Sequence, residues 1–97
     1  MPKAKPASRA PELQHQLRQI LGHEQIRVKP YGKHLLIQLV QNDGADTMAR
    51  LTDLGGGAYA AAFHSFTGRW EPLPGTGPLK EMAELLTTLV GVYLQPY

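Results

Sequence analysis

Apolar residues recur with a helical period near the N-terminus, with a period of two through the middle, and with a helical period again near the C-terminus. The first helical pattern has the spacing i, i+4, i+7 and i+8 and consists of Leu13, Leu17, Ile20 and Leu21. Pro11 suits a first helical position, and Glu12 suits the positive end of the helix dipole. The pattern predicts one amphipathic helix over 11–21, ended by Gly22.

The first ten residues are rich in proline, alanine, lysine and serine and have no periodic apolar face. Such a segment cannot bury enough apolar surface to offset the entropy that is lost on ordering. We therefore expect residues 1–10 to be a disordered basic tail and residues 11–97 to form a single domain.

Period-two spacing begins after the first helix, with a short strand over 26–29. The segment "KPYGK" predicts a turn, because Pro30 presets its own φ and Gly32 accepts the left-handed conformation. The return strand, "HLLIQLVQ" over 34–41, has apolar residues on both of its faces. A strand of this kind is typical of the centre of a sheet.

A turn over 42–46, "NDGAD", and a third strand over 47–54 lead to three consecutive glycines at 55–57. These glycines have two interpretations: a phosphate-binding loop before a helix that begins near Ala58, or the turn of a hairpin. Period-two spacing continues through Tyr59, Ala61 and Phe63, which favours the hairpin.

A second hairpin is predicted with Thr67 and Gly68 as its two-residue turn before the strand "RWEPLP" over 69–74. Its register pairs Phe66 with Arg69, Ser65 with Trp70 and His64 with Glu71. Trp70 then lies on the inward face of the sheet, together with Tyr59 and Phe63.

The last segment predicts a helix that opens at Thr76-Gly77-Pro78 and ends at Pro96. Its apolar stripe consists of Leu79, Met82, Ala83, Leu86, Leu89, Val90 and Tyr93. The predicted order is therefore an N-terminal helix, an antiparallel meander of four to five short strands, and a C-terminal helix. This order indicates an α+β fold with both helices on one face of the sheet.

The composition narrows the classes of function. The chain has 97 residues, of which 42% are hydrophobic and 19% are charged, as in a single folded domain. It has no cysteine, which excludes disulfides and thiolate chemistry. No apolar run approaches the roughly 18 residues of a membrane span, and no signal-peptide pattern follows the basic N-terminus. We expect a cytoplasmic protein that does not act at a membrane.

The charge is divided unevenly between the two parts of the chain. Residues 1–34 hold seven basic residues against two acidic ones, whereas residues 35–97 hold three against six. The formal charges of the two parts are therefore +5 and −3, and the whole chain has +2. Such asymmetry is typical of proteins that meet nucleic acid or an acidic surface, although a solvated tail produces the same excess.

The motifs for nucleotide, metal and catalytic chemistry are incomplete. The glycines at 55–57 lack the GxGxxG spacing, and "PGTGPLK" at 74–80 has Pro78 and Leu79 where a phosphate loop has Lys and then Ser or Thr. The four histidines show no metal-ligand spacing. Ser65 and His64 are neighbours on a predicted strand and point to opposite faces, so they do not form a nucleophile and its base. We expect no nucleotide cofactor, no metal and no catalytic set, and hence a non-enzymatic domain.

A basic surface around the first hairpin is the remaining candidate site. Cations beside a projecting aromatic ring provide phosphate contacts and base stacking. The predicted binding residues come from the first helix, the first strand and the turn and strand that follow, and are Arg18, Arg27, Lys29, Tyr31, Lys33 and His34. The alternative is a solvated edge hairpin, whose charges prevent aggregation.

The order helix, strands, helix is similar to that of the double-stranded RNA-binding domain, a family that contacts phosphates through a lysine cluster at the start of its last helix. In this chain that position carries Lys80 among Pro78, Glu81 and Glu84, and the number of predicted strands is larger. The resemblance is one of topology, and we claim no membership in the family.

The sequence therefore predicts a small binding domain that acts through an unidentified protein partner or as a homodimer. The partner would cover an exposed sheet edge or the face that bears Leu36 and Phe66. The alternative is nucleic-acid binding through the basic hairpin and the N-terminal tail.

Overall fold

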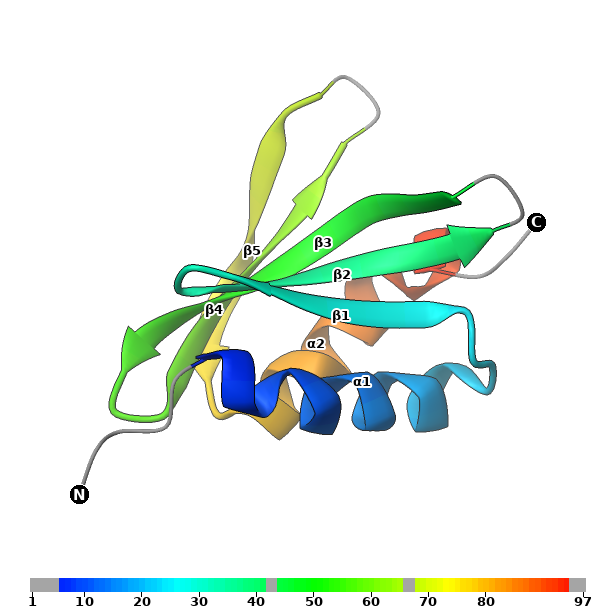
Figure 1. Ribbon diagram of the computed structural model, residues 1–97. Helices are drawn as coiled ribbons and strands as arrows, with labels where there is room; N and C mark the ends of the chain where they lie inside the picture. The colour runs from blue at the N-terminus through cyan, green and yellow to red at the C-terminus, as the bar shows by residue number, and fades with distance from the viewer. Residues whose placement is uncertain (1–5, 42–43, 66–67, 95–97) are drawn as a thin grey trace.

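The chain folds as a five-stranded antiparallel sheet with two helices packed on one of its faces (Figure 1). A computed structural model describes residues 6–41, 44–65 and 68–94. The elements are α1 (Pro6–Leu21), β1 (Ile26–Tyr31), β2 (His34–Gln41), β3 (Gly44–Gly55), β4 (Ala58–His64), β5 (Trp70–Gly77), α2 (Leu79–Val90) and the 3₁₀ helix η1 (Gly91–Leu94). The strands lie in the sheet in their chain order, so the predicted α+β meander is confirmed.

The core lies between the two helices and the sheet face that they cover. In β2, the alternating pattern turns Leu35, Ile37 and Leu39 toward the helices, where they are buried. The helices contribute the facing side chains Leu13, Leu17, Leu79, Met82 and Leu86. Burial of each side chain of this size stabilises the fold by about 1.5–3 kcal/mol, so the apolar pattern determines which sheet face is covered.

The three consecutive glycines form the turn between β3 and β4. Gly56 has φ of +64° and Gly57 has φ of +85°, in the left-handed region that residues with a Cβ rarely adopt. Gly55 pairs with Ala58, so Gly56 and Gly57 are the two central residues of a tight hairpin turn that requires positive φ at both positions. The hairpin interpretation is confirmed, because a strand and not a helix follows the glycines.

The first helix begins at Pro6 and not at Pro11, which lies inside it. The prediction began the helix at Pro11 because proline is favoured at a first helical position. Ala10 nevertheless continues the inward stripe of Leu13 and Leu17, and it is buried. The part of the predicted tail over 1–5 lies outside the described residues.

Three strands are longer than predicted. β1 continues through Pro30 to Tyr31, which pairs with His34, and the turn therefore consists of Gly32 and Lys33. Proline is tolerated there because β1 is an edge strand. β3 begins at residue 44 instead of 47, and β5 continues to residue 77. Residues 42–43 of the predicted turn lie outside the described ranges.

The predicted register of the second hairpin is wrong by one residue, and Trp70 consequently faces away from the core. Trp70 pairs with His64, and Glu71 pairs with Phe63. The N–H of Ser65 donates to the carbonyl oxygen of Arg69 at 2.9 Å, so the connection has three residues, 66–68, instead of two. One added residue moves each side chain of a strand to the other face. The predicted pairing of residue 66 lies outside the described residues.

The C-terminal helix buries most of its predicted stripe. Leu89 and Tyr93 are exceptions, with 45% and 59% of their surface exposed. The α-helix ends at Val90, and η1 has about 3.0 instead of about 3.6 residues per turn, so Tyr93 leaves the stripe. Its ring stacks on that of Phe63, with centroids 6.3 Å apart. The predicted end at residue 96 lies outside the described residues.

Candidate functional site

The two helices leave the opposite side of the sheet uncovered, and we call this side the open face (Figure 1). Every second residue of each strand points to it. One row across the sheet runs from Lys29 through Leu36 to Arg50. The register places these polar and aromatic residues on the open face: Arg27, Lys29, Tyr31, His34, Gln38, Thr47, Arg50, Thr52, His64, Trp70 and Thr76.

The open face is positively charged. Arg27, Lys29 and Arg50 lie on it, and the register of the described strand residues puts no aspartate or glutamate there. The acidic residues of these strands pair with residues that face the helices: Asp46 with Leu39, Asp53 with Tyr59 and Glu71 with Phe63. The fold therefore separates the strand charges by sign between the two sides of the sheet.

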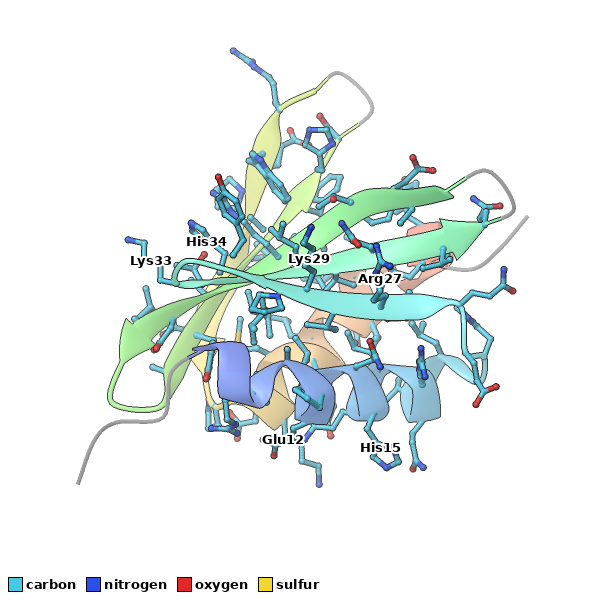
Figure 2. All side chains as sticks on the ribbon, viewed as in Figure 1. Glu12, His15, Arg27, Lys29, Lys33 and His34 are labelled. Carbon is cyan, nitrogen blue, oxygen red and sulfur yellow. The ribbon has the colours of Figure 1, made fainter. Side chains whose placement is uncertain are left out.

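Neighbouring carboxylates do not neutralise the cations of the open face. Within residues 6–41, 44–65 and 68–94, the one ion pair joins Arg9 to Glu12 on α1. Figure 2 shows Glu12 and His15 on the outer side of α1, and on the opposite side of the sheet Arg27, Lys29, Lys33 and His34. The cations Arg27, Lys29 and Lys33 therefore lie on the side of the sheet opposite to the outer surface of α1.

A hydrogen-bonded ladder orients Arg27. Its Nε and Nη2 donate to Oε1 of Gln38 at 3.2 and 2.9 Å, and Nε2 of Gln38 donates to Oγ1 of Thr47 at 3.1 Å. Gln38, the middle residue of this ladder, is buried, so three adjacent strands hold the guanidinium in place. A guanidinium held in this way is preorganised to bind a phosphate or carboxylate oxygen.

Arg50 lies over the indole ring of Trp70, with its guanidinium carbon 4.4 Å from the ring centroid. The His64 ring is 5.0 Å from the same indole and tilted by 59°. The cation–π contact between Arg50 and Trp70 stabilises the fold by about 0.5–2 kcal/mol. Nε of Arg50 is buried, and none of the described residues accepts its hydrogen bond. Arg50 is therefore fixed by stacking while one of its donors stays unpaired.

The pKa of His34 is lowered by its position on the open face. Its Nδ1 lies 2.8 Å from Oγ1 of Thr52. Burial lowers the pKa of His34 below its ordinary value of 6.5, and the charges of Arg50 and Lys33 lower it further. The imidazole is therefore mostly neutral at neutral pH. Tyr31, which pairs with His34, has 67% of its surface exposed.

A cleft opens where β4 separates from β3. Pairing between these strands reaches only to Ala49 and Phe63, so the first part of β3, residues 44–48, has β2 as its one paired neighbour among the described strands. The β4–β5 hairpin diverges from β3 at this point (Figure 1). The cleft has a volume of about 950 Å³. Its open-face wall includes Tyr31, His34, Leu36, Arg50, His64 and Trp70.

The structure brings four of the six predicted binding residues together on the open face: Arg27, Lys29, Tyr31 and His34. Lys33 lies in the adjoining turn. Arg18 lies elsewhere, because its Nε donates to the carbonyl oxygen of Ile26 at 2.9 Å on the helix side of β1. Arg18 is thus not brought together with the other five, and a binding role for all six stays a prediction.

Sequence reasoning did not include Arg50 and Trp70 in the site. Arg50 follows the alternation of β3, but only its pairing with Leu36 and Ala62 brings it beside the first hairpin. Trp70 was assigned to the core through the incorrect hairpin register. The unusual signal available in the sequence was that Trp70 is the one tryptophan of the chain.

The two outer edges of the sheet are poorly suited to adding another strand. On β1, the N–H of Val28 donates to Oε1 of Gln14 at 3.0 Å, and the carbonyl oxygen of Ile26 accepts from Arg18. On β5, Pro72 and Pro74 lack backbone N–H groups. These features favour the open face over a sheet edge as the binding surface.

No set of three histidine, aspartate or glutamate side chains that could hold a metal occurs in the part of the chain that the structure describes. None of the helices in that part is long and apolar enough to cross a membrane. Comparison of the chain with protein-family models, curated proteins and solved structures finds no match.

Proposed function

We propose that this protein is a non-catalytic binding module whose open face binds nucleic acid. The observation that supports this function is the joint presence of Arg27, Lys29 and Arg50 with the rings of Tyr31 and Trp70 on a side where the described strand residues place no carboxylate. Arginine and lysine contact phosphate oxygens, and aromatic rings stack on bases. A partner with acidic groups and flat rings matches both properties.

The positions of the cations suit a phosphate backbone that crosses the sheet. Arg27 and Lys29 are two residues apart on β1, which separates their Cα atoms by about 6.6 Å. Arg50 lies two strands from Lys29 in the same cross-strand row, about 10 Å away. Side chains of this length reach neighbouring phosphates from these positions. The cytoplasmic location expected from the sequence would give the protein access to RNA and DNA.

Titration of a labelled oligonucleotide at two salt concentrations tests this function. With about three phosphate contacts, raising the salt from about 50 to about 200 mM should weaken binding to a single strand about 20-fold, because counterions compete for the phosphates. Lys29→Gln should weaken binding and reduce the salt dependence, since Lys29 is an exposed cation of the open face.

Lys80→Gln is the matched control, because it removes the same charge from an exposed position on α2. Its affinity should equal that of the unaltered protein. Absence of binding at low salt, or equal losses in the two variants, would refute the proposed interface.

Protein contact is a second candidate function, supported by exposed apolar residues at the C-terminal ends of the helices. Ile20, Leu89 and Val92 have 47%, 45% and 77% of their surface exposed. Ile20 and Val92 line the same shallow groove between α1 and η1. Such residues are typical of contact surfaces, and the partner that we propose is a second copy of the chain.

Light scattering over a range of protein concentrations tests this self-association. A dimer should dissociate in Val92→Asp, because the aspartate would place a charge in the apolar contact. Thr76→Asp is the control, because it adds the same charge at an exposed position on β5 that does not line this groove. A monomer at every concentration would exclude the homodimer.

A further inference from the structure

The cleft between β3 and β4 constrains the kind of nucleic acid more closely than the charge of the open face does. It combines an open-face wall of rings and one guanidinium with an apolar floor formed by Met48, Phe63, Val90, Tyr93 and Leu94. Two acidic residues, Asp46 and Glu71, also line it. A site of this volume, about 950 Å³, lies in the range of pockets that hold a small ligand. It is large enough for one nucleotide.

We propose that the open face binds single-stranded nucleic acid and that one unpaired base enters this cleft beside Arg50 and Trp70. This inference rests on the proposed function and names the substrate class of the same site. Duplex DNA or RNA would still be attracted by the cations, but its bases are paired and stacked and would have to be flipped out to enter.

Exposed rings favour a strand with free base faces. Tyr31 is 67% exposed at the rim of the cleft, next to His34. An exposed tyrosine ring on a sheet provides a surface on which an unpaired base stacks, whatever its sequence. In a duplex, both faces of each interior base are already covered by its neighbours. The open face therefore offers a stacking contact that only a single strand accepts.

The unpaired donor of Arg50 favours a ligand group that accepts hydrogen bonds. Arg50 lines the cleft, and its Nε is buried and has no acceptor among the described residues. A buried donor without a partner is costly, and a ligand that supplies an acceptor recovers this free energy. Base carbonyls, ring nitrogens and phosphate oxygens are all acceptors. The stacking of Arg50 on Trp70 keeps the guanidinium oriented before a ligand arrives.

The tryptophan provides a direct readout, because the chain contains only one, Trp70. Its intrinsic fluorescence should be quenched when a base enters the cleft. The probes are a 12-nucleotide DNA strand of mixed sequence, the same strand annealed to its complement, and a poly-glutamate peptide of equal charge. We expect the single strand to bind at least tenfold more tightly than the duplex and to be the one probe that quenches Trp70.

Arg50→Lys keeps the charge but removes the planar guanidinium and its Nε. It should weaken single-strand binding about tenfold and leave duplex binding unchanged. Arg9→Lys on α1 is the matched control, and Tyr31→Leu, at an exposed position, is a second test that does not alter the core. Tyr31→Leu should lose about tenfold in single-strand affinity through the lost stacking contact.

The outcomes separate the two proposals. Equal affinities for single strand and duplex without quenching would overturn base insertion and leave the phosphate-binding interface standing. Equal binding and quenching by poly-glutamate would also overturn it, because the cleft would then accept an acidic peptide. No binding to either nucleic acid at low salt would overturn the proposed function as well.

Discussion

His34 lies among the cations of the open face. Burial is the main cause that lowers its pKa, and the charges of Arg50 and Lys33 lower it further. Its Nδ1 lies within hydrogen-bond distance of Oγ1 of Thr52, and Tyr31 pairs with it from β1. The folded state thus favours the neutral imidazole. This contribution to stability is present above the ordinary pKa of 6.5 and is lost as the pH falls through the lower pKa of the folded state.

We expect Arg50→Met to raise the pKa of His34, because one of the two neighbouring positive charges is removed. An NMR titration of the His34 imidazole measures this pKa. Arg69→Met removes an equal charge from an exposed position next to β5 and should leave the pKa unchanged. An unchanged pKa in Arg50→Met, or the same rise in both variants, would contradict this assignment of the field.

Among the elements, β1 depends on α1 for more than apolar packing. Gln14 accepts from the backbone N–H of Val28, and Arg18 donates to the carbonyl oxygen of Ile26. Two polar side chains of α1 thereby form hydrogen bonds with backbone groups at the outer edge of β1. Such capping also prevents the edge from pairing with another chain.

Gln14→Leu should lower the free energy of unfolding by about 1 kcal/mol, since one side-chain-to-backbone hydrogen bond is lost. Gln19→Leu is the control, because Gln19 is exposed on the same helix and the substitution is identical. Urea denaturation of the two variants gives the comparison. If both variants unfold at the same urea concentration as the unaltered protein, the bond from Val28 contributes nothing measurable.

At the scale of the whole molecule, an uneven charge along the chain becomes an uneven charge between two faces. The basic excess of residues 1–34 contributes Arg27, Lys29 and Lys33 to the open face and its rim. It also contributes Arg9 and Arg18, which α1 uses for an ion pair and an edge contact. Arg50, from the acidic part of the chain, joins the open face instead. The distribution of charge along the sequence therefore predicted only part of the basic surface.

Local patterns predicted the element types well, because helix and strand periods depend on neighbouring residues. The β2 strand was predicted over its full extent, residues 34–41, and the glycine turn at 55–57 was correctly assigned to a hairpin. The boundary at Pro30 was wrong because β1 is an edge strand, where the lost N–H of a proline is tolerated. The boundary at Pro11 was wrong because the helix continues through this proline to Ala10, which packs in the core, and beyond.

The sequence by itself determined the α+β class, the order of the elements and the face of each helix that is buried, since these follow from periodicity within one segment. The tertiary structure decided the composition of the candidate site. One extra residue in the connection before Arg69 turned Trp70 to the open face, and strand pairing brought Arg50 against it. Side-chain direction alternates at each residue, so register between strands decides which residues meet, and no local pattern specifies it.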